Sequence, residues 1–298
     1  MKHQHSHLDK IWIDKENPDV KYIEKIFKKY DFHELDREAI LEENQQTRLD
    51  PYDDYLFIVL YFPKFDKKTQ RYLANELNIF ISKEYLITFR YYRSYTLQKV
   101  QNKYIQRDKE NKTISPAFIL YDIIENFLDK TTKMLKFFSM DIKKLEKQVF
   151  STRNTKTIHE IMIKKRNIIT LKHMMQPQIS VLKLIEFHMK RRFSNEVELY
   201  FENLEDKLDK IFLEIQIIEE NLDSLEDALK SIFDLETNIT MKYLTIFSAF
   251  MLPLTLATSF FGMNTKNGHF SDVAIWGTLI FVSIFCLGLL IIYLRKKH

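Results

Sequence analysis

The spacing of hydrophobic residues changes twice along the 298-residue chain. Up to about residue 105, short helical patterns alternate with strand-like runs. Residues 115–192 then have apolar positions every three or four residues and no glycine, and after Lys242 charged residues almost disappear. These changes predict an α/β domain over residues 1–110, a helical and stalk region over 111–240 and a transmembrane hairpin over 241–298.

The first part is expected to contain helices and strands in turn. The segments LDKIWID (8–14) and YDDYLFIVLYF (52–62, ending at Pro63) are predicted strands, and LNIFIS (77–82) with EYLITFR (84–90) forms a predicted hairpin. Between them, helical spacing predicts helices within 18–32 and 33–44.

The second part is expected to be entirely helical. Pro116 is predicted to stand at the start of a helix, whereas Pro177 is expected to kink or interrupt a helix. A coiled-coil seam spaced 4, 3, 4, 3, 4, 3 follows, and it consists of Ile211, Ile215, Ile218, Leu222, Leu225, Leu229 and Ile232. With no strong breaker after it, this seam predicts one helix from about Asn195 through Gly262, about 100 Å long. Only ~30 Å of that length fits in a membrane, so the remainder is expected to be a stalk.

Charge is divided sharply between these helices. Residues 130–192 hold sixteen Lys or Arg against four Asp or Glu, whereas residues 214–236 hold eight acidic residues and only Lys230. Two interpretations stay open: two solvated faces attract each other, or acidic residues around an oligomeric stalk collect divalent cations.

Two segments are long enough to cross a bilayer. Residues 243–265 and 273–294 contain no Asp, Glu, Lys or Arg. Lys242 precedes the first, a basic cluster of Arg295, Lys296 and Lys297 follows the second, and the intervening loop holds one lysine. The excess of positive charge at the outer flanks predicts a multi-pass protein of the cell membrane with both termini in the cytoplasm.

Composition excludes several classes. The single Cys286 excludes a disulfide framework and a cysteine-based zinc site, and the N-terminus lacks the apolar core of a secretory signal. The net charge of +4 is too small and too scattered to indicate nucleic acid. No nucleophile–base pair, phosphate loop or HExxH pattern is present, so we expect neither an enzyme nor an organic cofactor.

Two helices cannot enclose a polar path through lipid, because a pore wall must be closed on every side. If the chain conducts anything, it must do so as a homo-oligomer embedded in membrane lipid.

The first predicted span ends in Gly262-Met263-Asn264, just before the loop. With this GMN in this place, the run TNITMKYLTIFSAFMLPLTLATSFFGMN resembles the pore helix of the CorA family of magnesium channels. The upstream segment HELDREAILEENQQTRLDPYDDYLFIVLYFP and the basic RKKH end resemble the same family.

This resemblance implies an α+β membrane protein that forms a homopentameric funnel, with the first span lining the pore. It places the selectivity filter at Gly262, Met263 and Asn264, and a basic ring at Arg295, Lys296 and Lys297. The pore-lining and gating positions that it implies are Asn238, Met241, Leu244, Leu252 and Thr255.

The chemistry of these residues agrees with such roles. Magnesium holds its six waters tightly, so a mouth of neutral Asn264 carbonyls would bind the hydrated ion and release it again. Thr255 would form a hydroxyl ring, and the apolar residues Met241, Leu244 and Leu252 would form constrictions suited to dewetting. Ordinary helix packing or lipid contact is the alternative for each apolar residue.

The resemblance also implies a regulatory metal site at Asp227, which matches the family's stalk aspartate. The expected partner segment, YYRSYTLQKVQNK (91–103), has no acidic residue, so Asp227 would pair with another acid such as Asp223, or regulation would differ. The loop carries Lys266 near the mouth, where the family usually has acids, which would slow uptake or alter selectivity.

Three functions therefore stay open: a channel for Mg²⁺, which Co²⁺ and Ni²⁺ would also pass; a zinc transporter of the ZntB branch; and a membrane-anchored scaffold or sensor that conducts nothing. Met263 favours magnesium, since the ZntB branch tends to vary this residue. His3, His5 and His7 form either a metal-binding tail or a disordered one.

Overall fold

The computed structural model describes residues 7–42, 46–151, 155–193 and 195–262, together with 273, 276–278, 280–285 and 288. Contacts among the described residues divide the chain into two compact units, Met1–Glu226 and Asp227–His298. The predicted divisions after residues 110 and 240 rest on composition alone and stay predictions.

A five-stranded mixed sheet, ordered β1-β5-β4-β3-β2, lies at the centre of the first unit. Its strands are β1 (Trp12–Glu16), β2 (Arg48–Pro51), β3 (Leu56–Asp66), β4 (Arg71–Ile81) and β5 (Leu86–Arg90). Only β1 and β5 pair in parallel, and the other pairs are antiparallel. The predicted hairpin is confirmed, since β4 and β5 pair from Ile81↔Leu86 onward.

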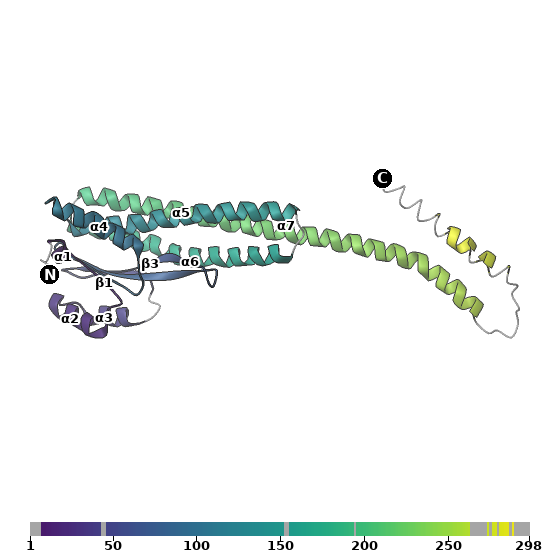
Figure 1. Cartoon of the computed structure of the whole chain (residues 1–298), viewed down its shortest axis with the longest axis horizontal. Coiled ribbons are helices and arrows are strands. Elements are labelled where there is room, and N and C mark those ends of the chain that lie inside the picture. The colour runs from purple at the N-terminus through teal and green to yellow at the C-terminus, as the bar shows by residue number, and fades with distance from the viewer. Residues whose placement is uncertain are drawn as a thin grey trace. The chain divides into compact units, whose positions relative to one another are not determined.

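Two short helices cover one face of the sheet (Figure 1). Helix α2 (Val20–Tyr30) is capped by the Asp19 carboxylate, and α3 (Glu34–Leu41) follows it. Alternate strand residues such as Phe57, Phe80 and Phe89 pack against their buried apolar faces. Both predicted helices are confirmed.

A buried carboxylate fixes α3 to the turn between β2 and β3. Asp36 is fully buried and accepts hydrogen bonds from the hydroxyls of Tyr52 (2.8 Å) and Tyr55 (2.7 Å). Burial raises the pKa of Asp36, and the two tyrosine hydrogen bonds oppose that rise. These residues belong to the upstream segment that resembles the CorA family. Part of that resemblance therefore reflects a structural contact, which holds α3 against the turn.

Long helices cover the other face (Figure 1). Helix α5 (Pro116–Ser151) and helix α6 (Thr155–Arg192) both contact β3, and α4 (Tyr95–Lys109) lies against α5. The all-helical character of this region and the start at Pro116 are confirmed. Helix α4 was not predicted, because its mixed and polar sequence has only weak apolar periodicity.

Helix α7 (Asn195–Gly262) is a single element of 68 residues with the predicted bounds. Its seam from Ile211 to Leu225 is buried, and it begins earlier than the sequence indicated, with Val197, Phe201, Leu204 and Leu208. Edge-to-face ring contacts join Phe201 and Tyr200 to Tyr121 of α5. The first nine seam positions are therefore buried within one chain, whereas we expected the seam to belong to a stalk.

The predicted end of β3 at Pro63 is wrong, because the strand continues to Asp66. Beyond Val59, β2 no longer pairs with β3, and the backbone of Tyr61 bonds instead to the Gln178 side chain (N–Oε1 3.2 Å, O–Nε2 2.8 Å). Pro63 is two residues further on and faces the same edge, so its missing N–H leaves the ladder to β4 intact.

Two other predictions need correction. Residues 7–11 form a short helix, α1 (His7–Ile11), because Leu8 and Ile11 are buried at helical spacing, and the strand begins only at Trp12. Of the two outcomes predicted for Pro177, a kink or an interruption, the interruption is wrong, because α6 runs unbroken past this residue. The side chain of the next residue, Gln178, donates to the Met174 carbonyl at 2.9 Å.

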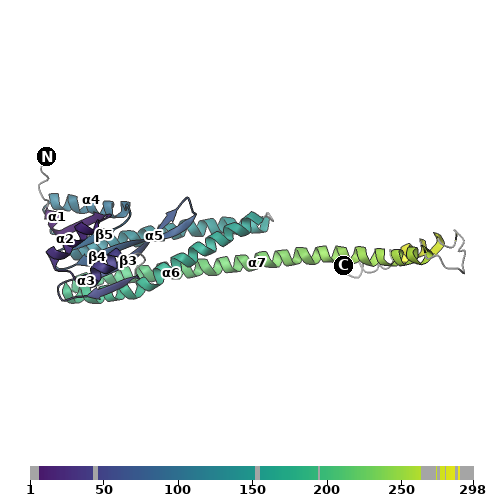
Figure 2. The same ribbon diagram turned by 90° about the horizontal axis from the view of Figure 1, so that it is seen from below.

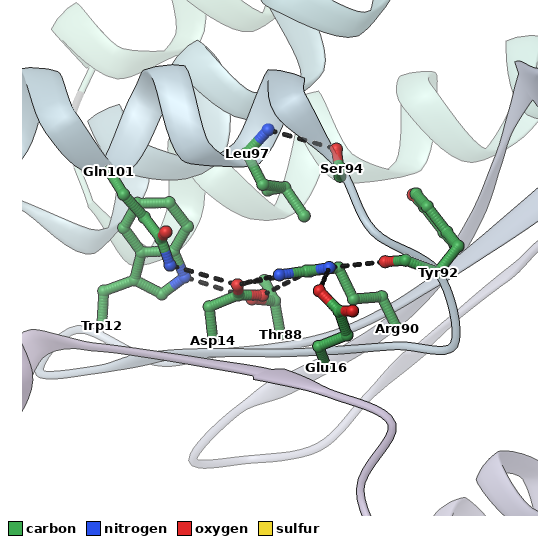
Figure 3. Close-up of polar contacts among 9 residues, drawn as sticks. All are labelled: Trp12, Asp14, Glu16, Thr88, Arg90, Tyr92, Ser94, Leu97 and Gln101. Atoms are coloured by element: carbon green, nitrogen blue, oxygen red, sulfur yellow. Dashed lines mark hydrogen bonds and ion pairs between the residues drawn. The ribbon is translucent and has the colours of Figure 1, made fainter.

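A buried ionic network joins β1 to β5 and α4 (Figure 3). The side chains of Arg90 and Asp14 are 5% and 3% exposed, and they pair at 2.9 Å. Asp14 also accepts hydrogen bonds from Thr88 and Gln101, and Arg90 pairs with Glu16 at 2.6 Å. Burial opposes the charge on Arg90, but these acidic partners outweigh it and raise the pKa of the guanidinium.

Replacing Arg90 with Met should strongly destabilise the first unit. The substitution leaves Asp14 buried without its counter-ion, and breaking a buried pair costs about 3–5 kcal/mol. We expect the thermal unfolding midpoint of the purified protein to fall by about 10 °C. Lys112→Met, which removes the exposed pair with Glu110, is the control. Equal midpoints for the two variants would contradict this role.

Candidate ion pathway and its acidic stalk

The predicted pore-lining residues share one face of α7. They are Asn238, Met241, Leu244, Leu252, Thr255 and Gly262, and no break in the helix separates them. At about 100° per residue they fall within an arc of about 120°. A continuous helix therefore aligns them in the stripe that a pore lining requires.

This stripe is uncovered in the single chain. Met241 and Leu244 are each 55% exposed and Leu252 is 69% exposed. The most apolar window of the helix is long and apolar enough to span a membrane, and none of it is buried. So much exposed apolar surface requires lipid, further copies of the chain, or both.

The Thr255 hydroxyl is oriented by its own helix. Its Oγ1 donates to the Met251 carbonyl at 2.8 Å, which commits the only proton of the hydroxyl. The remaining lone pairs can only accept hydrogen bonds. Waters around a cation point their protons outward, so this polarity suits a hydrated cation.

Several predicted site residues lie outside the described residues. Met263, Asn264 and the basic residues Arg295, Lys296 and Lys297 are among them, as are His3 and His5, so these assignments stay predictions. Gly262 is the last described residue of α7. Of the second predicted span, the described part includes an apolar helical piece from Trp276 to Phe285.

Helices α6 and α7 are joined by a ladder of ion pairs. Lys165 contacts Asp223 (2.8 Å) and Glu226 (2.6 Å), Lys172 contacts Glu219 (2.6 Å), and Lys183 contacts Glu205 (3.0 Å). Lys190 pairs with Glu198 at the far end of the ladder. The residue numbers of the acids on α7 fall as those of the lysines on α6 rise, as expected for two antiparallel helices. This confirms the interpretation that the basic and acidic faces attract each other.

The two acids proposed for regulation differ in their surroundings. Asp223 is held by Lys165, and the hydrogen bond that Lys165 donates to Asp223, followed by the one it donates to Glu226, raises the pKa of this lysine. The Asp227 side chain is 77% exposed, and its carboxylate meets only the Lys230 ammonium, at 3.6 Å, among the ion pairs of the described chain. Within the described residues, no three His, Cys, Asp or Glu side chains gather as a metal site. Asp227 is thus the better placed of the two for an outside cation.

The model of the family described as "CorA-like Mg2+ transporter protein" matches residues 9–296, nearly the whole chain. The chain belongs to this family. The family is one of membrane transporters for metal ions and is not a class of enzymes. The resemblance inferred from the GMN motif and the segment before it is confirmed.

Individual relatives and solved structures agree with this assignment. The "Cobalt/magnesium transport protein CorA" of Thermotoga maritima is 22% identical over 287 residues, which cover 92% of this chain and 79% of that protein. Among solved structures, the complete CorA magnesium transporter of Methanocaldococcus jannaschii matches with a TM-score of 0.78 and 17% identity, over 94% of this chain and 90% of that one. The ZntB cytoplasmic domain of Vibrio parahaemolyticus matches with a TM-score of 0.62 and 15% identity, over 75% and 87%. At these identities the two structures establish the fold alone.

In this CorA-family chain, sequence reasoning missed the lysines that neutralise the stalk acids. Lys165 and Lys172 are seven residues apart and so lie on one face of α6. Aligning that face antiparallel with the acidic stretch of α7 would have identified Lys165 as the competitor for Asp223.

A double-mutant cycle on Lys172→Met and Glu219→Gln should measure the strength of the ladder. Both side chains are partly exposed, so the coupling should be about 0.5–1 kcal/mol in low salt and should shrink in 1 M salt. Denaturant unfolding of the four proteins gives this value. A coupling near zero at low salt would mean that the apolar seam alone holds α7 against α6.

Proposed function

We propose that the chain forms a homopentameric channel in the cell membrane that admits hydrated Mg²⁺ to the cytoplasm. The observation that carries this proposal is the unbroken helix α7, whose exposed stripe of pore-type residues leads directly into the GMN motif. Membership of the CorA-like Mg²⁺ transporter family and the name of the Thermotoga relative support magnesium as the cargo.

Oligomerisation follows from the bilayer. One hairpin leaves the stripe facing lipid, where Asn238 and Thr255 would be poorly solvated. A ring of copies with the stripe turned inward places these polar groups around water and the outer faces of the helices against lipid. Five copies is the number that the family resemblance implies.

The proposed filter acts on the hydration shell and leaves it intact. Mg²⁺ gives up its waters reluctantly, so the Asn264 amide oxygens and the Thr255 hydroxyl oxygens would accept hydrogen bonds from those waters. Neutral acceptors bind weakly enough to allow release. A divalent ion gains about 4.6 kcal/mol per 100 mV when it enters a negative interior, so the membrane potential can drive uptake.

Asn264→Ala should abolish magnesium entry. The change removes the amide ring from the mouth, so Mg²⁺ influx into proteoliposomes that contain a magnesium dye should fall by at least about tenfold. Asn267→Ala, three residues further along the loop, is the matched control and should retain flux. Parallel measurements with Zn²⁺, with and without a pH gradient, test the ZntB-like alternative.

The outcomes separate the three hypotheses. Zinc flux that follows the proton gradient, without magnesium flux, would show that the transported ion is zinc and not magnesium. A verified oligomer that passes neither ion would support a scaffold or sensor and would contradict the channel.

We also propose that cytoplasmic Mg²⁺ binds at Asp227 and favours the closed state, because a ligand that binds one state better shifts the population toward it. Asp227→Asn should raise the Mg²⁺ concentration that protects the channel from limited proteolysis, by about fivefold or more. Asp206→Asn, an exposed acid elsewhere on α7, is the control. Identical protection curves for the two variants would exclude Asp227 from the sensing site.

A further inference from the structure

A pocket of about 420 Å³ lies in the first unit, between the outer end of the β3–β4 hairpin and helices α5 and α6. Its walls include Phe65 and Tyr72 from the hairpin, Lys130, Lys133 and Phe137 from α5, and Asn167 from α6. This volume is within the range of small-molecule sites. The proposed ion pathway does not use any of these residues.

The hairpin end of the pocket is fixed by specific contacts. Asn167 is buried, and its Nδ2 donates to the Gln70 carbonyl at 2.9 Å. Gln70 has a left-handed backbone (φ 55°), and the Asp66 carboxylate closes the same turn by accepting from the Thr69 hydroxyl at 2.7 Å. The Tyr72 ring then contacts the Phe138 ring, with centroids 6.2 Å apart. The pocket is therefore formed before any ligand enters.

The pocket carries an excess of positive charge. Lys130 and Lys133 are three residues apart on α5, so they share a face, and neither forms an ion pair with a described residue. Asp141 is the only acid in the lining, and it already pairs with Lys164 (3.0 Å) and Lys144 (3.4 Å). Partial desolvation of its ammonium group, followed by repulsion from Lys64, lowers the pKa of Lys130. The arrangement lacks a counter-ion, so it favours an anion.

The same pocket offers flat apolar surface. Four aromatic rings line it, namely those of Phe65, Tyr72, Phe137 and Phe138. Phe137 is 69% exposed, which is unusual for a phenylalanine on a helix that is otherwise packed. Aromatic faces beside lysines suit a ligand that combines a flat ring with negative charge.

We propose that this pocket binds a nucleoside phosphate, with the base against the aromatic wall at Phe137 and the phosphates at Lys130 and Lys133. An inorganic phosphate would leave the rings uncovered, and a neutral aromatic molecule would leave the two ammonium groups without a counter-ion. The site requires no phosphate loop, in agreement with the sequence. It is independent of the proposed channel function, because binding is measured without transport.

Equilibrium dialysis of the full-length, detergent-purified protein with ATP in EDTA tests the proposal without interference from magnesium. Wild type should bind ATP saturably, and Lys130→Ala/Lys133→Ala should weaken binding by at least about tenfold, because two charge-assisted contacts are lost. Phe137→Ala should weaken ATP binding and leave tripolyphosphate binding unchanged. All three side chains are exposed, so the variants should fold normally, which their unfolding midpoints would verify.

The matched control is Lys143→Ala/Lys147→Ala, which removes two exposed lysines of the same helix outside the pocket lining. This variant should bind ATP as wild type does. Equal weakening by the control would overturn the proposal in favour of general charge attraction. Tripolyphosphate binding as tightly as ATP, or no saturable ATP binding at all, would overturn it as well.

Discussion

The burial of α7 along one apolar seam is the constraint on which the rest of the chain depends. From Val197 to Leu225 the helix is covered by its own chain, and further along, the described residues have no comparable cover. The first stretch stabilises a folded domain by removing apolar area from water. The second leaves its side chains available to lipid or to other copies. One continuous helix thus has a buried apolar part and an exposed apolar part.

Charge is used differently in the two places where it accumulates. In the sheet, the side chains of Arg90 and Asp14 are almost fully removed from water. Both carboxylate oxygens of Asp14 accept hydrogen bonds, which is the condition under which a buried ion pair is tolerated. Along α6 and α7 the pairs are half exposed, so each contributes little alone. Together they set the register, because five of them fix which turn of α7 lies opposite which turn of α6. The courses of the two helices can be followed in Figure 2.

The periodicity of the sequence predicted the long elements. The remaining elements depend on contacts between residues that are distant in the sequence. The bounds of α7 and the hairpin of β4 with β5 follow from spacing alone, because many residues repeat one pattern. Helix α4 and the extension of β3 past Pro63 could not be predicted, since both depend on partners distant in sequence, such as Gln178. For the candidate site, the sequence placed the stripe on one helix face. It could not reveal that Lys165 engages Asp223, because that contact joins residues on two helices.

The Gln178 side chain has a further consequence at the outer edge of β3. It occupies the backbone N–H and C=O of Tyr61, and Pro63 removes the next outward donor, so this edge offers little to an incoming strand. An unpaired strand edge can pair with the edge of another molecule and so cause aggregation. With one glutamine and one proline, the fold closes this stretch of the strand edge against pairing with another strand.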